Sequence, residues 1–187
     1  AEFFNVYNLP IVSIPPNKPS IRKDHKDVVY ATYDSKIAAV CSIVSKRRKE
    51  GQPVLIGTSS VEESEQISKV LSSMNENHRV LNARDHSKEA SIIAQAGRWG
   101  EVTVATNMAG RGVDILLGGN AEFLTDLSYS TWANSTDTAS LSEDTLENVY
   151  AQISRQHKEL CSTDAEEIRG LGGLLVLGIS KNNSQRV

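Results

Sequence analysis

The chain has 187 residues, a hydrophobic fraction of 39%, a charged fraction of 23% and a formal net charge of −3. This length predicts one domain with one core, and the composition is that of an ordinary globular protein. No apolar run is long enough to cross a bilayer, the two cysteines are far apart and the four histidines are scattered, so we expect neither a membrane span nor a protein-ligated metal.

The N-terminal region is predicted to be a short strand followed by an extended segment. Ile11–Ile14 is rich in β-branched residues, and the prolines that follow disfavour helix because each fixes its own φ and restricts the residue before it. The first ten residues lack the layout of a signal peptide and begin as if inside a domain. We therefore expect the chain to be a fragment of a longer protein.

A helix is predicted at Ser35–Lys49, with Asp34 as its N-cap and Gly51 as its stop. Its last turn is the basic run Lys46–Lys49. A solvated C-terminal turn, favoured by the helix dipole, explains this run better than a phosphate or nucleic-acid patch does.

Strands and helices alternate through the middle of the chain. Ser60 and Glu63 form a capping box that predicts the start of one helix. The alternation indicates an open, mainly parallel α/β sheet with right-handed crossovers and helices on both faces. In chain order the expected elements are a strand at Pro53–Gly57, a helix from Ser60, a strand at Arg79–Leu81, a helix at Ser87–Ala96 stopped by Gly97, a strand at Val102–Thr106 and a last strand at Gly172–Gly178.

A glycine-rich polar loop follows the strand Val102–Thr106 and carries two charged residues, Arg111 and Asp114. Such loops, at the carboxyl ends of strands, are where open α/β sheets bind ligands. The residues alone leave two interpretations open, a binding loop or a solvated turn in which the two charges pair with each other. The glycines that permit tight turns or close approach are Gly110, Gly112, Gly118 and Gly119.

Residues 120–170 are expected to form a surface insertion. They hold ten acids and three bases, whereas the rest of the chain holds thirteen acids and seventeen bases. The polar first part is predicted to be a partly mobile loop. From Glu143 to Leu160 helical periodicity returns, which predicts either one helix packed on the domain or the arm of a two-helix protrusion. Trp132 either anchors a partner protein or attaches the loop to its own domain.

The segment ATNMAGRGVDILLGGN, which contains the charged loop, resembles the helicase-type motif V of the SecA family, the ATP-driven motors of bacterial and plastid protein export. Apart from Ala121–Leu171, the rest of the chain follows the family's order, with FNVYNLPIVSIPPNKPSIRK, GQPVLIGTSSVEESE, VLNARDHSKEASIIAQAG and GGLLVLG. The resemblance implies that residues 1–187 are the second of the family's two RecA-like nucleotide-binding domains, with a P-loop NTPase-type fold.

The resemblance also implies a nucleotide site shared between two domains. This chain contains no G-x-x-x-x-G-K-[ST] phosphate loop, so ATP or ADP with Mg²⁺ would be held mainly by the first domain. Arg111 is implied as the catalytic residue, near the phosphates or in the ion pairs that close the domains, because a guanidinium stays charged and presents two donors. The implied nucleotide-binding residues are Asp114, Gly110, Gly112 and Thr106, with Gly57 and Thr58 at a secondary motif.

The implied partners are the first nucleotide-binding domain of the same parent and, through the parent, a preprotein and a SecYEG-type membrane channel. The parent is expected in the cytoplasm and at the periphery of the inner membrane, or in the plastid stroma. It is possible for the parent to be a homodimer, and nucleic acid is not expected as a partner. The family's arginine-finger motif is expected a few residues after Arg186, so the isolated fragment is expected to be inactive.

Two features leave other interpretations open. Leu175 and Ile179 stand where the family usually has histidine and threonine, which leaves a housekeeping motor, a diverged accessory form and a plastid form as alternatives. The architecture and the charged loop also fit the C-terminal domain of a superfamily 2 nucleic-acid helicase. Another alternative is a non-catalytic interaction domain with residues 120–170 as its docking arm.

Overall fold

The computed structural model describes residues 2–17, 19–81, 86–106, 114–136 and 141–180. The chain divides into two compact units, residues 1–30 and residues 31–187. In the first unit, the described residues that follow α1 (Glu2–Tyr7) form neither helix nor strand, and Ile14 is 85% exposed. The predicted strand at Ile11–Ile14 is therefore wrong, because β-propensity forms a strand only where another strand satisfies its backbone. That residues 1–187 form a single domain remains a prediction.

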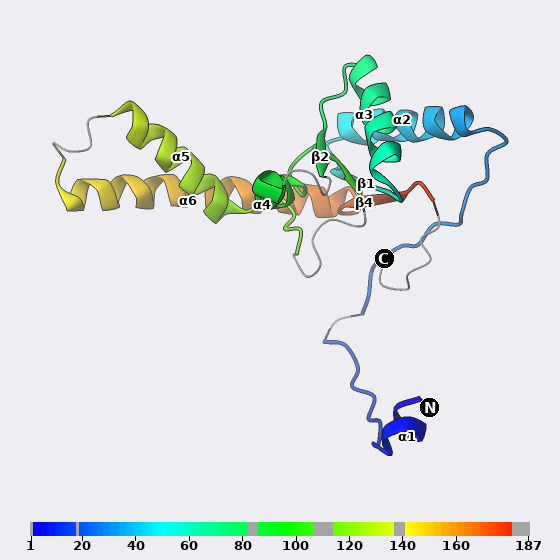
Figure 1. Cartoon of the computed structure of the whole chain (residues 1–187). Helices are drawn as coiled ribbons and strands as arrows, with labels where there is room; N and C mark the ends of the chain where they lie inside the picture. The colour runs from blue at the N-terminus through cyan, green and yellow to red at the C-terminus, as the bar shows by residue number, and fades with distance from the viewer. Residues whose placement is uncertain (1, 18, 82–85, 107–113, 137–140, 181–187) are drawn as a thin grey trace. The chain divides into compact units, whose positions relative to one another are not determined.

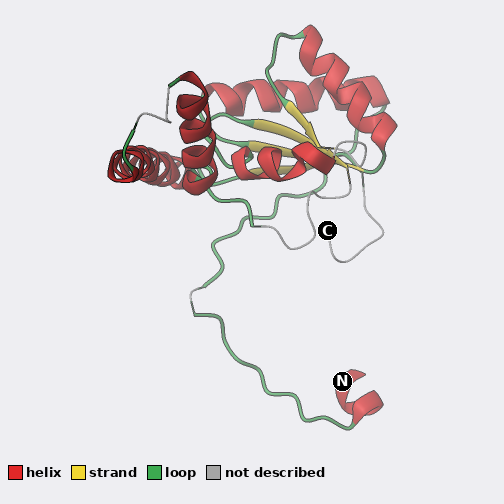
Figure 2. Cartoon of the chain, turned by 60° about the vertical axis from the view of Figure 1, so that its left-hand side comes forward, coloured by secondary structure: helices red, strands yellow, loops and turns green. Residues whose placement is uncertain are grey.

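The second unit contains a four-stranded parallel sheet with the order β2-β3-β1-β4. Figure 2 shows the strands in yellow with helices packed around them. The predicted open parallel sheet is confirmed, with two strands at their predicted bounds and the ends of the first and the last strand shifted by one to three residues. The strands are β1 (Val54–Thr58), β2 (Arg79–Leu81), β3 (Val102–Thr106) and β4 (Leu175–Gly178).

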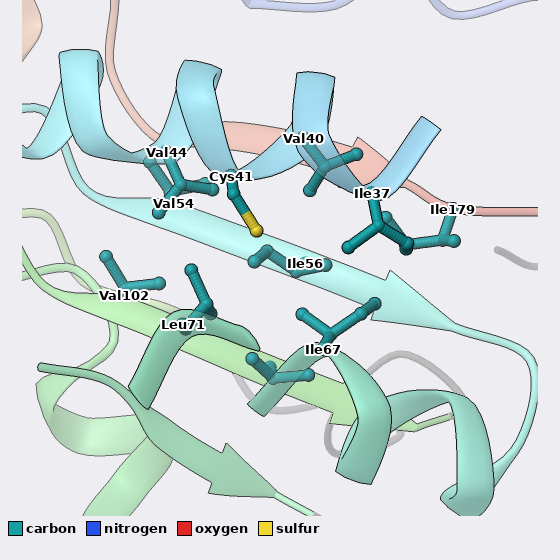
Figure 3. Close-up of a cluster of buried hydrophobic side chains, with 11 residues drawn as sticks. Ile37, Val40, Cys41, Val44, Val54, Ile56, Ile67, Leu71, Val102 and Ile179 are labelled. Atoms are coloured by element: carbon teal, nitrogen blue, oxygen red, sulfur yellow. The ribbon is translucent and has the colours of Figure 1, made fainter. Parts of the chain in front are cut away.

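Two buried clusters cover the two faces of the sheet, as predicted. On one face, α2 (Tyr33–Lys49) and α3 (Val61–Ser73) pack over Ile56 and its neighbours (Figure 3). On the other face, α4 (His86–Gln95) contributes Ile93. Burial of one such side chain contributes roughly 1.5–3 kcal/mol. The first cluster consists of Ile37, Val40, Cys41, Val44, Val54, Ile56, Ile67, Leu71, Val102, Val104 and Ile179.

The helix starts correct two details of the sequence analysis. The N-cap of α2 is Thr32, and Asp34 lies in the first turn, where its charge still favours the positive end of the helix dipole. Ser60 caps α3 as predicted, since its hydroxyl accepts a hydrogen bond from the Glu63 N–H at 3.2 Å. The Glu63 carboxylate does not close the capping box, because it accepts from Ser59 instead.

The end of α2 has the structure expected of a solvated helix terminus. Gly51 follows the C-cap with a φ of +89°, a conformation that glycine adopts without strain. Arg47 pairs with Glu50 at 3.1 Å, and Arg48 pairs with Glu76 at 2.6 Å. These pairs use two of the four cations of the basic run, which favours the structural interpretation of the run.

Residues 121–135 form a helix, α5 (Ala121–Ser135), so the prediction of a loop there is wrong. The side chain of Asn120 caps this helix by accepting the N–H groups of Glu122 and Phe123 at 3.0 and 3.1 Å. Hydroxyl groups that suggested a loop instead donate to carbonyls one turn back, as Thr125 does to Ala121 at 2.7 Å. The polar composition therefore indicated a loop where the chain forms a capped helix.

We call α5 and α6 (Glu143–Gly170) together the arm. Figure 1 shows the two helices side by side, which matches the predicted two-helix protrusion. Tyr129 joins them, with its ring centroid 5.3 Å from that of Tyr150 and 5.5 Å from that of Trp132. Trp132 thus packs within the arm itself. None of the helices in the described ranges is long and apolar enough to span a membrane.

Candidate functional site

The strands β1, β3 and β4 end side by side, and we call this end of the sheet the carboxyl edge. In the ladder between β1 and β3, Gly57 lies opposite Ala105 and Thr58 lies opposite Thr106. The fold thus brings together Gly57, Thr58 and Thr106, three of the predicted site residues. Parallel α/β sheets bind their ligands at this end, because the loops that follow the strands converge there.

Thr58 has a structural task at this edge. Its side chain is buried, and its hydroxyl lies 3.2 Å from the carbonyl oxygen of Ser60 and 3.3 Å from that of Ala105. A hydroxyl has one hydrogen to donate, and both acceptors belong to the protein. Thr58 therefore fixes the turn after β1, and a ligand role for it stays a prediction.

The charged loop is only partly within the described residues. Gly110, Arg111 and Gly112 lie outside them, so their predicted roles stay predictions. Asp114 is described and is exposed, and the next residue, Ile115, packs against the buried cluster under α4. Thr106 is half-buried at the end of β3. The two ends of the loop are thus anchored to the same sheet.

After Asp114, the chain packs closely against Gly97, which follows α4, and against the backbone of α6 at Gly118. The N–H of Gly118 donates to the Gly97 carbonyl at 2.8 Å. A Cβ atom on Gly118 would lie 2.0 Å from the carbonyl oxygen of Cys161, and one on Gly97 would lie 2.1 Å from that of Leu116. Both glycines are therefore required by close backbone packing.

Gly97 follows the end of α4, as predicted. Helix α4 ends at Gln95, one residue before the predicted end, and Gly97 does not have a left-handed φ, so close packing and not backbone conformation requires a glycine there. The Asn120 N–H donates to the Ala94 carbonyl at 3.0 Å, which adds a second backbone bond between α4 and the segment after the loop. The segment 115–120 is consequently a rigid support for Asp114.

Two charged side chains at the carboxyl edge, Lys36 and Glu63, were not among the predicted site residues. Lys36 lies in the second turn of α2, and its ammonium nitrogen is 3.8 Å from a carboxylate oxygen of Glu63 in α3. Glu63 was assigned only to the capping box. Spacing along the chain gave no signal for Lys36, because its partner belongs to a different helix.

Two of the predicted site residues that the structure describes bring polar groups of different kinds. Thr106 brings a hydroxyl and Asp114 a carboxylate, and the carboxylate accepts hydrogen bonds from ribose hydroxyls or a bridging water, whereas it repels phosphate oxygens. No group of three or more His, Cys, Asp or Glu residues that could hold a metal ion occurs in the described part of the chain.

Comparison with known proteins gives the family. A family model described as the SecA P-loop domain matches residues 19–187. The chain belongs to the SecA family. Over its whole length it is 43% identical to the protein translocase subunit SecA of Symbiobacterium thermophilum, covering 22% of that protein. It is 48% identical to the SecA subunit of Bifidobacterium longum subsp. infantis and 46% identical to SecA 1 of Mycolicibacterium smegmatis, covering 19% of each.

Membership of the SecA family settles two points of the sequence analysis. The parallel sheet with helices on both faces is an α/β fold of the RecA-like class, as predicted. The matches extend over the whole chain, so the arm lies within the aligned length, whereas the motif comparison had left Ala121–Leu171 outside it. The chain spans about a fifth of the length of the curated relatives that it matches.

Proposed function

We propose that this chain forms the second half of the ATP site of a SecA-type motor, which couples ATP hydrolysis to the transport of preproteins across a membrane. The observation that carries the proposal is the carboxyl edge, where Thr58 and Thr106 end neighbouring strands and the charged loop begins. Its relatives are named protein translocase subunits. The sequence lacks a phosphate loop, so a first domain of the parent must hold the nucleotide phosphates.

In this proposal, the chain closes over nucleotide from the side opposite the first domain. ATP with Mg²⁺, when bound, supplies the phosphoryl group and part of the charge compensation. Arg111 stabilises the negative charge that develops as the terminal phosphate leaves, or joins the ion pairs that close the two domains. Gly110 and Gly112 leave room for its approach, and Asp114 contacts the ribose directly or through water.

The same proposal assigns the partners and the place of action. The first nucleotide-binding domain is the immediate partner, and the preprotein and a SecYEG-type channel are reached through the parent. The parent acts in the cytoplasm and at the inner membrane. Two of the four basic residues at the end of α2 are paired with acids, which favours this assignment over nucleic-acid binding.

The test is the steady-state ATPase activity of the full-length protein that contains this chain. Arg111→Ala should lower kcat by about one to several orders of magnitude, because it removes a cation from the transition state or from the closed domain pair. Asp114→Asn should chiefly change nucleotide affinity or release. Arg155→Ala, at an exposed position of α6, is the matched control.

Thermal stability measured on the same variants separates this proposal from a surface pair. If Arg111 and Asp114 only pair with each other, each substitution should cost at most about 1 kcal/mol of stability and leave the kinetics alone. Normal turnover in both variants would refute the proposed site.

A further inference from the structure

One acidic side chain joins two chain segments at the carboxyl edge. Glu63 is 12% exposed, and one of its carboxylate oxygens accepts hydrogen bonds from the N–H of Ser59 at 2.9 Å and from its hydroxyl at 3.0 Å. The same oxygen accepts from the hydroxyl of Ser180 at 3.3 Å. Glu63 therefore bridges the turn after β1 and the chain that leaves β4.

The second carboxylate oxygen of Glu63 faces a cation from another helix. The ammonium nitrogen of Lys36 lies 3.8 Å from it, 3.3 Å from the carbonyl oxygen of Ile179, and 4.6 Å from the ring centroid of Tyr33. The side chain of Lys36 is 26% exposed. The cation thus contacts the start of α3 and the residue that follows β4 together.

Further contacts surround this pair. The hydroxyl of Tyr33 donates to the side-chain oxygen of Gln66 at 3.1 Å, which joins the first turn of α2 to the second turn of α3. The N–H of Ile179 donates to the Gly57 carbonyl at 2.9 Å, so the ladder between β1 and β4 continues one step past β4. Partial burial, and after it the negative charges of Glu63 and Asp34, raises the pKa of Tyr33.

Capping of α3 does not require this arrangement. The cap needs only the Ser60 hydroxyl and the N–H of residue 63, and both are present without any contribution from the carboxylate. The N-terminus of α3 favours a nearby negative charge, but that attraction acts within the helix and does not explain Lys36 or Ser180. The arrangement therefore adds a polar connection between segments that the sheet and the first buried cluster also join.

We propose that the ion pair of Lys36 and Glu63 positions the carboxyl edge for nucleotide. The pair holds the turn at residues 58–60 and the exit from β4 at residues 179–180 in one fixed relation, and thereby presents the edge in the geometry that accepts nucleotide. Both are positioning residues, and this inference rests on the proposed function.

The kinetic test uses the full-length protein. Lys36→Met keeps the aliphatic stem and removes the charge, and it should raise the KM for ATP about threefold to tenfold with kcat nearly unchanged, because a contact that prepares the edge acts on binding. Lys36→Arg keeps the charge and should restore the KM. Lys69→Met, at an exposed position of α3, is the matched control and should behave as the wild type.

A double-mutant cycle tests the coupling itself. If Lys36 and Glu63 act as one unit, Lys36→Met combined with Glu63→Gln should raise the KM no further than the more severe single variant does. Additive effects on the KM would overturn the proposal, as would a lowered melting temperature with an unchanged KM.

Hydrogen exchange on the same variants separates this inference from the proposed function. The amides of Ser59 and Ile179 should exchange faster in Lys36→Met than in Lys69→Met, because the ammonium group that contacts both the Glu63 carboxylate and the Ile179 carbonyl is lost. If Arg111→Ala leaves turnover normal while exchange still responds to Lys36, the ATP site is wrong and the coupling remains. If Arg111→Ala abolishes turnover and Lys36→Met changes neither exchange nor KM, only this inference is refuted.

Discussion

Gly118 gives the most quantitative prediction, because two independent costs meet at this residue. Its φ is +82°, a left-handed conformation that costs an alanine about 1–2 kcal/mol. The added Cβ would also lie 2.0 Å from the carbonyl oxygen of Cys161 and 3.0 Å from the backbone nitrogen of Ala165. Both neighbours are backbone atoms of α6, so the helix itself has to move, and overpacking of this kind costs about 1–3 kcal/mol.

We therefore expect Gly118→Ala to lower the free energy of unfolding by about 2–5 kcal/mol. The matched control is Gly173→Ala, because Gly173 has a φ of +79° but no atom within 4 Å of the position of a Cβ. Urea unfolding of both variants, followed by circular dichroism, measures the difference between them. Equal losses of stability would show that α6 does not press on the segment after the loop, and would refute the reasoning.

Three further predictions concern the chain as a whole. The 187-residue chain alone should hydrolyse ATP no faster than buffer in a phosphate-release assay, because it has no phosphate loop, and partner-free turnover that a substitution in this chain abolishes would contradict this. Hydrogen bonds from Ser45 and Arg48 hold the pKa of Glu76 below its ordinary value of 4.5, so its stabilisation is present above that pH and is lost as the pH falls through the lowered pKa. Urea midpoints measured across this range should fall less steeply in Glu76→Gln than in the wild type. Burial raises the pKa of the thiols of Cys41 and Cys161, so both should react slowly with a thiol reagent in buffer and rapidly in urea, and fast labelling in buffer would place them at the surface.

The sheet was predictable from the sequence because its two inner strands can be recognised from their local residue pattern. Buried parallel strands appear as short apolar runs, and Val54–Thr58 and Val102–Thr106 are such runs. The departures from the family pattern at Leu175 and Ile179 also have a physical place, since both apolar side chains pack against the first buried cluster. Local pattern and burial agree in these elements.

The missed features depend on contacts between distant parts of the chain. The serines and threonines of α5 are typical of a loop until their hydroxyls bond to carbonyls of the same helix. Gly97 matched a helix stop by its position, and only the packed structure shows the carbonyl of Leu116 against it. Lys36 and Glu63 meet because α2 and α3 cover the same face of the sheet. The hydrophobic periodicity of each helix does not show which helices become neighbours.

The place of β4 in the sheet has a consequence for synthesis on the ribosome. Val54 pairs with Leu175, so β1 keeps one unpaired side until the whole arm has been translated. At about 5–20 residues per second, the chain from Thr106 to Leu175 takes roughly 4–14 s to emerge. During that interval the apolar surface later covered by β4 and Ile179 faces water. A nascent chain stalled within the arm should therefore be a better chaperone substrate than one released after Ile179.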